Sequence, residues 1–368
     1  MSAFHTRESK RYRVFVTGAT GLVGMHVVQH LGAKGHDLVV MTRASSDMAE
    51  LRRMIRETGI QVTFVTADLV DKPELAQYMQ GCDVVIHTAA RIDPHGAPEV
   101  LKAINVEGTR LVLDAAVTAH VKHFIYISSL SVIMGDKDCY GITESEPLRR
   151  CKEAYANSKI AAEEIVMSAA SRGDIKVTAM RPGFIYGPNE TSWLPKLIFN
   201  MKAHTALMVG DGSKETNLIY VENLCRAIEL SMLNEVAYGQ IYNLTDGERV
   251  SKKQLVDEIA AQLEIPKIRI YIPLAAARFL VSSSSAIALC APLRLRSRLA
   301  VFSRPALRLI GLNQGFDISK AERELGYVER IPFAVGMKKT LQSFRDKRSD
   351  RREPHDDRPV RELTEHRI

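Results

Sequence analysis

Short runs of β-branched and other apolar residues recur along the first half of the chain and alternate with stretches of helical periodicity. The apolar runs lie at residues 12–17, 37–42, 61–66, 83–88, 123–128 and 176–181. Helical spacing fills the intervals, as in residues 100–119. Strands that alternate with helices form βαβ units, in which a parallel sheet is covered on both faces. The pattern predicts an α/β fold with a doubly wound parallel sheet over residues 11–190.

The pattern changes after about residue 190, where the predicted elements become shorter. We expect residues 191–343 to form a smaller, mostly helical C-terminal substrate domain over the carboxyl edge of the sheet, with some later segments returning to the first domain. Residues 344–368 are polar and carry mixed charge. Such a segment buries too little apolar surface to offset its ordering entropy, which predicts a disordered tail.

Composition narrows the class of protein. Of the 368 residues, 46% are hydrophobic and 25% are charged, as in soluble proteins with a large core. The five cysteines form no CxxC pair, and the eleven histidines form no HxxxH or HExxH pattern. A disulfide framework or a metal site is therefore not expected. Because the N-terminus also lacks the apolar run of a signal peptide, the reducing cytoplasm is the simplest location.

The net charge of +7 is concentrated in one segment. Between residues 271 and 316 there is no acidic residue. The arginines of this segment are Arg278, Arg294, Arg296, Arg298, Arg304 and Arg308. Such local charge argues against a broad nucleic-acid-binding surface.

Residues 276–310 join these arginines to an apolar stretch, and two interpretations remain open. The segment is typical of a basic amphipathic helix that makes a peripheral contact with the cytoplasmic face of an anionic membrane. It is also consistent with a helix that covers the substrate cavity while its arginines are solvated. Arg278, Pro292 and four serines interrupt it, so no transmembrane span is expected. Both interpretations favour a hydrophobic substrate.

The first predicted strand runs directly into the sequence TGATGLVG, which contains Gly18, Gly21 and Gly24. Glycines are needed where a strand turns sharply into a helix, where the backbone approaches a pyrophosphate, and where the helix packs on the strand. The helix N-terminus then faces the phosphates. At the start of a βαβ series this predicts a Rossmann-type dinucleotide-binding turn, the alternative being a tight turn without a ligand.

The end of the second predicted strand bears on which dinucleotide binds. A carboxylate there would accept hydrogen bonds from the ribose 2′-hydroxyl of NAD. The sequence VVMTRASS has no acid before Asp47 and puts Arg43 where a 2′-phosphate would lie. We expect NADP(H) to be preferred and NAD(H) to be the second choice, unless Arg43 is only a solvated strand end.

Tyr155 and Lys159 lie four residues apart in the predicted helix EAYANSKIAAEEI. Residues at this spacing share one helix face, so a phenol and an ammonium can serve one small site. The alternative is a surface tyrosine stacked on a lysine stem.

Several motifs occur together and in a fixed order. They are GATGLVG, Asp68-Leu69 after the third strand, HTAA after the fourth, NVEGT on the next helix, YISSLSV after the fifth strand, YANSK and RPGFIYGP, with FDISKAERELGY nearer the C-terminus. Over residues 12–188 they resemble the extended short-chain dehydrogenase/reductase superfamily of the NAD-dependent epimerase/dehydratase type.

The resemblance implies the catalytic roles. Tyr155 would pass a proton to or from the substrate oxygen while hydride moves at the nicotinamide, and Lys159 would hold the ribose hydroxyls and lower the tyrosine pKa. The physical basis is that an adjacent ammonium favours phenolate. Ser129 would hydrogen-bond the substrate carbonyl, with Ser128 and Ser131 as alternatives.

The resemblance also implies the remaining site residues. Asn105 shapes the site, or else only caps or packs its helix. Asp68 and Leu69 would frame the adenine. Ala89 and Ala90 would lie along the pyrophosphate and nicotinamide ribose, and Pro182 would border the nicotinamide. The full cofactor-binding set is Gly18, Thr20, Gly21, Leu22, Val23, Gly24, Arg43, Asp68, Leu69, Ala89, Ala90, Tyr155, Lys159 and Pro182.

Departures from the family's patterns bear on the branch. Dehydratases carry an Asp-Glu pair after the catalytic serine, whereas this chain reads SSLSVIMGDKD. Epimerases commonly show YGxSK and Arg-Tyr-Phe-Asn, whereas this chain reads YANSK and RPGF. The chain is most similar to the 3β-hydroxysteroid dehydrogenase-like and dihydroflavonol reductase-like branches.

We therefore predict an NAD(P)(H)-dependent oxidoreductase that interconverts a ketone and a secondary alcohol on a sterol-like or lipidic substrate. The alternatives are a nucleotide-sugar epimerase with tightly bound NAD and a non-catalytic NADP-sensing protein. The resemblance also implies a homodimer joined through two helices of each subunit.

Overall fold

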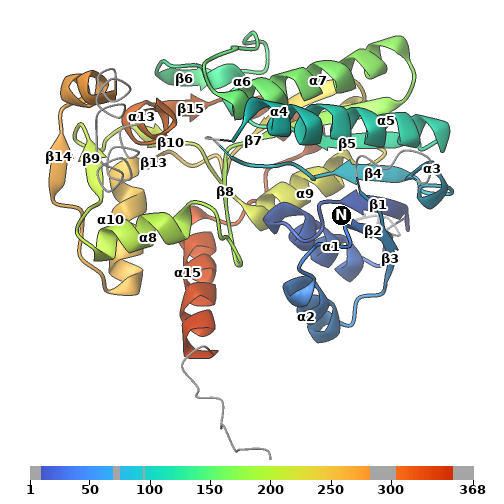
Figure 1. Cartoon of the computed structure of the whole chain (residues 1–368), viewed down its shortest axis with the longest axis horizontal. Helices are drawn as coiled ribbons and strands as arrows, with labels where there is room; N and C mark the ends of the chain where they lie inside the picture. Colours follow the sequence, from blue (N-terminus) through green and yellow to red (C-terminus); the bar gives the residue numbers. More distant parts are fainter. Residues whose placement is uncertain (1–9, 69–74, 94–95, 282–303, 351–368) are drawn as a thin grey trace, which may run out of the picture.

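Seven parallel strands form the central sheet (Figure 1). The computed structural model describes residues 10–68, 75–93, 96–281 and 304–350. The sheet order is β12-β7-β5-β4-β1-β2-β3, and all neighbours are parallel. The strands are β1 (Arg13–Thr17), β2 (Asp37–Thr42), β3 (Val62–Thr66), β4 (Val84–His87), β5 (His123–Ile127), β7 (Lys176–Pro182) and β12 (Gln240–Leu244). Each of the six apolar runs matches a strand to within one residue at either end, which confirms the predicted doubly wound sheet.

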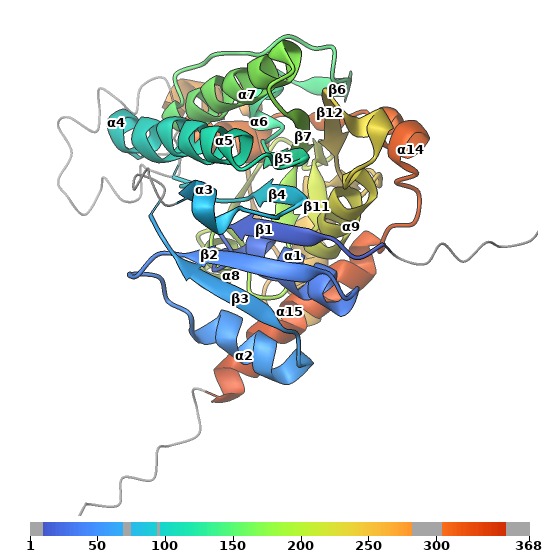
Figure 2. The ribbon, with the colours of Figure 1, turned by 90° about the vertical axis from the view of Figure 1, so that its right-hand side faces the viewer.

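Side chains of the strands enter two apolar cores, one on each face of the sheet. On β1, Val14 and Val16 belong to the first core and Phe15 to the second. Most of the strands are buried on both faces and are therefore rich in apolar residues, whereas the edge strand β3 has only exposed and half-buried residues. The first core is completed by α1 (Leu22–Ala33), α2 (Ala49–Thr58), α9 (Val221–Ser231) and α14 (Ser319–Leu325), and the second by α3 (Leu75–Tyr78), α5 (Gly108–Thr118) and α7 (Ala154–Arg172). In Figure 2, α5 and α7 lie on one side of the sheet and α2 lies on the other.

A third apolar core lies in the C-terminal region. It is formed mainly by α8 (Leu194–Lys202), α10 (Lys252–Leu263) and α15 (Phe333–Asp350). Pairs of short strands accompany it: β6 (Cys139–Ile142) with β15 (Gln314–Phe316), β8 (Phe184–Tyr186) with β11 (Leu218–Tyr220), β9 (Leu207–Val209) with β14 (Ile270–Ile272), and β10 (Glu215–Thr216) with β13 (Val250–Ser251). The remaining short elements are α4 (Pro98–Leu101), η1 (Lys102–Glu107), α6 (Ser131–Met134), η2 (Glu235–Ala237) and α13 (Arg304–Gly311).

Helix α15 corrects the predicted boundary of the tail. Residues 344–350 are helical, so disorder does not begin at residue 344. One face of α15 packs Phe333, Met337 and Leu341 into the third core. A helix anchored in this way extends by one hydrogen bond per added residue, which offsets the ordering entropy that the polar composition alone suggested.

Three predictions fall wholly or partly outside the described residues. They concern Leu69, most of the basic segment (residues 282–303) and the end of the tail (residues 351–368). Within the described ranges, no helix combines the length and apolar character needed to cross a membrane.

The strand order reverses between β1 and β4. The chain leads from β1 to β2 and β3 on one side, whereas β4, β5 and β7 lie on the other. At such a reversal a crevice forms outside the carboxyl ends of the strands, where ligands of open α/β sheets bind. The fold thus gathers at one edge the residues that follow these strands, among them Gly18, Ala89 and Ser129.

Candidate active site

The turn between β1 and α1 brings the backbone into close contact with the segment after β4. Gly18 has a φ of +72°, and a Cβ there would lie 2.6 Å from the backbone nitrogen of Ala89. A Cβ on Gly24 would lie 2.3 Å from the carbonyl oxygen of Gly18. Only glycine fits either position, so the spacing of the glycines in the sequence is explained by these close backbone contacts.

The N-terminus of α1 is suited to an anion. Gly21 is its N-cap, provides no side-chain cap, and is followed by no acidic residue in the first turn. The first amides of a helix lack partners within the helix and carry the positive end of its dipole. These amides, with the glycine turn, fit the pyrophosphate of a dinucleotide.

Residues predicted to contact the rest of the dinucleotide lie along the same edge. Arg43 is exposed and directly follows β2, and its backbone nitrogen donates to Ser46 Oγ at 3.2 Å. Asp68 is half-buried just after β3. The Ala89 nitrogen donates to Thr17 Oγ1 at 3.4 Å, next to the half-buried Ala90. These positions form one line from the sheet's β3 side to its centre.

Pro182 lies beside the loop that contains Ser129, the predicted catalytic serine. It ends β7, and its carbonyl oxygen accepts a hydrogen bond from the Leu130 nitrogen at 3.0 Å. The structure thereby brings the segment predicted to border the nicotinamide next to Ser129.

Helix α7 carries Tyr155 in its first turn and Lys159 one turn later. The Tyr155 hydroxyl lies close enough to the Ser129 side chain for Ser129 to lower its pKa. Lys159 is 3% exposed, its Nζ donates to the Ile127 carbonyl oxygen at 2.6 Å, and it lies 4.3 Å from the centre of the Tyr126 ring. Such burial excludes the alternative of a solvated tyrosine and lysine pair on the surface.

Burial dominates the electrostatics of this pair. It raises the pKa of Tyr155 to about 12, the nearby Glu153 carboxylate acts in the same direction, and the Ser129 hydrogen bond opposes both. Burial also lowers the pKa of Lys159 to about 7, against the attraction of Glu163. The sequence predicted that Lys159 lowers the pKa of Tyr155, but in this structure that pKa is raised. Burial of the phenol is the largest cause, and the spacing of the two residues does not predict it.

The three candidate serines have different surroundings. Ser128 Oγ donates to the buried Glu163 carboxylate at 2.6 Å, so it faces away from the phenol. Ser131 Oγ is buried and has no hydrogen-bond partner within the described residues. Its backbone nitrogen donates to Ser129 Oγ at 3.2 Å. Of the three, Ser129 is the one whose hydroxyl meets Tyr155.

Asn105 lies in a turn of π-helix that sequence periodicity did not reveal. Residues 100–119 were expected to form one α-helix, but Lys102–Glu107 is π-helical. The Asn105 amide accepts from the Arg91 nitrogen at 2.8 Å and donates to the Arg91 carbonyl at 3.1 Å and to Ser158 Oγ at 3.0 Å. It therefore ties the loop after β4 to α7, beside Lys159. Wide turns of this kind occur often at functional sites.

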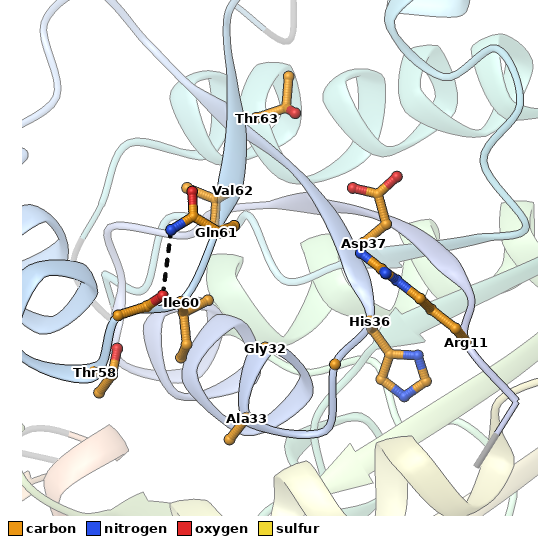
Figure 3. Close-up of a pocket in the computed structure, with 12 residues that line it drawn as sticks. Arg11, Gly32, Ala33, His36, Asp37, Thr58, Ile60, Gln61, Val62 and Thr63 are labelled. Atoms are coloured by element: carbon orange, nitrogen blue, oxygen red, sulfur yellow. Dashed lines mark hydrogen bonds between the residues drawn. The ribbon is translucent and has the colours of Figure 1, made fainter. Parts of the chain in front are cut away.

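A pocket of about 570 Å³ lies at the opposite edge of the sheet (Figure 3). Its lining includes His36, Asp37 and Gln61, at the amino ends of β2 and β3. None of the predicted site residues lines it, so it is separate from the candidate active site.

Comparisons with known proteins agree with this geometry. The chain is 27% identical to the 2-alkyl-3-oxoalkanoate reductase of Shewanella oneidensis, over 93% of this chain and 89% of the relative. It is 30% identical to 3beta-hydroxysteroid-dehydrogenase/decarboxylase isoform 1 of Arabidopsis thaliana, over 92% and 80% of the two chains.

A solved structure shows the same fold. The dTDP-glucose 4,6-dehydratase DesIV of Streptomyces venezuelae, solved with NAD bound, superposes with a TM-score of 0.73 at 24% identity, over 92% of this chain and 98% of the other. Residues 14–245 match the model of the NAD dependent epimerase/dehydratase family. This chain is a member of that family.

Proposed function

We propose that the protein is a reductase that transfers hydride from NADPH to a ketone of a hydrophobic molecule. The observation that carries the proposal is the Tyr155 hydroxyl, which lies close to Ser129 and one helical turn before the buried Lys159. A phenol with a pKa of about 12 keeps its proton at neutral pH, so it is ready to act as the general acid that ketone reduction requires.

Each group of the site has one task in this proposal. The bound dinucleotide supplies the hydride. Ser129 and Tyr155 donate hydrogen bonds to the substrate oxygen, and Tyr155 delivers the proton as the alcohol forms. Lys159 and Asn105 hold the helix and loop that frame the site, since both have buried partners on the neighbouring segments. The positive end of α1 binds the pyrophosphate.

The proposed substrate class follows from the relatives' names and from the C-terminal region. The two relatives are named for an alkyl-substituted oxoalkanoate and for a hydroxysteroid. Large apolar side chains of the C-terminal region are exposed, including Phe199 at 70% and Phe279 at 72%. Exposed apolar side chains of this size could contact a hydrophobic substrate.

The decisive experiment uses NADPH deuterated at the transferable C4 position. The protein is incubated with a lipid extract and, in parallel, with a nucleotide-sugar pool, and products are searched by mass spectrometry. Deuterium in a lipid alcohol supports the proposal. An unlabelled new sugar isomer would instead indicate an epimerase that returns its own hydride, and binding of NADPH without any product would indicate a sensing protein.

The preference for NADPH is proposed from Arg43. It is exposed at the carboxyl end of β2, and no carboxylate precedes Asp47 there. We expect Arg43→Ala to raise the KM for NADPH by roughly tenfold, because one charged contact to the 2′-phosphate is lost. The KM for NADH should stay unchanged, and Arg52→Ala, which removes an exposed arginine of α2, is the control. Equal effects on both cofactors would contradict the assignment.

We also propose a cytoplasmic location with peripheral contact to an anionic membrane. The exposed Ile270 and Tyr271 lie next to the exposed bases Lys267 and Arg269, and such a mixture favours an anionic lipid surface. Flotation with phosphatidylglycerol vesicles, compared with phosphatidylcholine vesicles, tests the contact. Protein that stays at the bottom of both gradients would contradict it.

The proposed homodimer is tested separately. The resemblance implies contact through two helices of each subunit. Light scattering on the purified protein distinguishes a dimer from a monomer of 41.0 kDa.

A further inference from the structure

Arg308 departs from the expectation that the arginines of the basic segment are solvated. It lies on α13, and its side chain is 5% exposed. Its guanidinium donates to Asp136 Oδ1 at 2.7 and 3.2 Å, to the carboxylate of Glu153, and to Cys151 Sγ at 3.2 Å. The sequence pattern did not reveal these partners, because they lie more than 150 positions earlier in the chain.

The partners of Arg308 surround the beginning of α7. Glu153 is the N-cap of this helix and precedes Tyr155 by two residues. Cys151 is fixed in the preceding loop, because Asn157 Oδ1 accepts from its nitrogen at 3.0 Å and Asn157 Nδ2 donates to its carbonyl at 2.6 Å. The first turn of α7 is thus held from inside by Asn157 and from outside by Arg308.

The carboxylate of Glu153 acts on the phenol. Its negative charge raises the pKa of Tyr155. The other groups that act on Tyr155 are the Ser129 hydroxyl, which lowers its pKa, and the phenol of Tyr126. Lys159 follows one turn later but is directed at the Ile127 carbonyl. The guanidinium of Arg308 donates to the Glu153 carboxylate, so it offsets part of the effect of Glu153 on Tyr155.

We propose that Arg308, acting through Glu153, is a positioning residue that sets the electrostatic field in which the Tyr155 hydroxyl delivers its proton. Helix α13 then takes part in catalysis although it touches no reacting atom. The inference rests on the proposed reductase activity only for its kinetic test.

Removal of the guanidinium takes away a positive charge that contacts this carboxylate close to the phenol. Arg308→Gln should therefore lower kcat for ketone reduction by roughly tenfold, since a weaker acid transfers its proton more slowly, while the KM for NADPH stays within about twofold. The limb of the pH profile that reports Tyr155 should move to higher pH. Arg308→Lys keeps a positive charge and should retain most of the wild-type limb.

The double variant separates this role from a purely structural one. In Arg308→Gln with Glu153→Gln, the carboxylate that lost this counter-charge is also removed, so kcat and the pH limb should return toward wild type. Arg172→Gln is the control, because it breaks an exposed ion pair at the other end of the same helix. A wild-type limb in Arg308→Gln, or no recovery in the double variant, would overturn the proposal.

Two further measurements keep the inference testable in every case. If Arg308→Gln does not fold, Glu153→Gln alone should move the limb to lower pH, and an unmoved limb counts against the proposal. If the wild-type protein reduces no ketone, the proposed function fails, and ¹³Cζ-tyrosine NMR decides about Arg308. The Tyr155 resonance, assigned by its loss in Tyr155→Phe, should shift in Arg308→Gln and return in the double variant; an unshifted resonance overturns the inference.

Discussion

Two ion pairs flank Tyr155 and Lys159 along α7, and they differ in their access to water. Glu163, one turn beyond Lys159, pairs with Arg181, and the two side chains are 2% and 3% exposed. Glu153 pairs with Arg308 and is 12% exposed, while the second carboxylate on this arginine, Asp136, is 51% exposed. The first pair joins α7 to the central sheet, and the second joins its start to the C-terminal region.

The difference in exposure predicts different effects when each ion pair is broken. A charge that loses its partner in a dry interior has no water to replace it, so the inner pair stabilises the fold against loss of either member. A carboxylate near solvent can be partly rehydrated, so loss of the outer pair changes the field near Tyr155 with less unfolding. We therefore expect the Glu163–Arg181 pair to hold α7 in place and the Glu153–Arg308 pair to set the electrostatic field near Tyr155.

The largest expected effect belongs to the hydroxyl between the two pairs. Tyr155→Phe should lower kcat by roughly 10²- to 10⁴-fold, because the general acid is lost while the ring that packs is kept. Steady-state kinetics with the identified ketone measure this effect. Tyr140→Phe changes a tyrosine that is 69% exposed and serves as control. Turnover that survives Tyr155→Phe would remove Tyr155 from the mechanism.

The inner pair gives the next largest effect. Arg181→Met leaves the Glu163 carboxylate buried with only Ser128 as a remaining donor among the contacts described above, and should lower the free energy of unfolding by about 3–5 kcal/mol. Urea denaturation measures it, with Arg172→Met, an exposed arginine at the end of α7, as the control. If Arg181→Met is no less stable than Arg308→Gln, the contrast between the two pairs is wrong.

Lys159 gives a pH-dependent effect. Its pKa is lowered to about 7 in the fold, against 10.5 as the ordinary value, so the unfolded chain binds a proton that the folded chain releases between these pH values. Burial of Lys159 therefore destabilises the fold fully below pH 7, and the penalty fades as the pH rises toward 10.5. Lys159→Met should be more stable than wild type at pH 7, by a margin that shrinks at pH 9. A margin independent of pH would contradict the shifted pKa.

The smallest effect is expected for a third carboxylate of α7. Glu164 pairs with Arg150 at 2.7 Å, and the two side chains are 47% and 59% exposed. Arg150→Ala should change the free energy of unfolding by less than about 1 kcal/mol, because solvent screens exposed pairs. Urea denaturation at low and high salt checks this. A loss as large as that of Arg181→Met would show that exposure does not rank these pairs.

Much of the fold and part of the site could be predicted from local sequence patterns. Most of the strands were predicted because both of their faces are buried, which makes them short apolar runs, and the edge strand β3 was predicted from its β-branched residues. Tyr155 and Lys159 were paired because the spacing of four is a property of one helix. The glycine turn was recognised because close backbone contacts leave no choice of residue at Gly18 and Gly24.

What was missed depends on contacts between distant segments or on desolvation. The π-helical turn at Asn105 is a small change of helical period that apolar spacing does not resolve. The partners of Arg308 come from another part of the chain, so its charge pattern suggested solvent or a membrane. The raised pKa of Tyr155 reflects how deeply the phenol is buried. The identities and spacing of Tyr155 and Lys159 do not predict this burial.

The return of late segments to the central sheet has a consequence for biosynthesis. Strand β12 forms the edge beside β7, and α14, which ends at Leu325, completes one of the apolar layers. A nascent chain that has only reached residue 190 therefore carries an unpaired strand edge and an uncovered apolar face, both of which invite aggregation. The domain predicted over residues 11–190 can complete its fold only near the end of translation. A gene fragment cut at residue 190 should therefore yield insoluble protein rather than an independent nucleotide-binding domain.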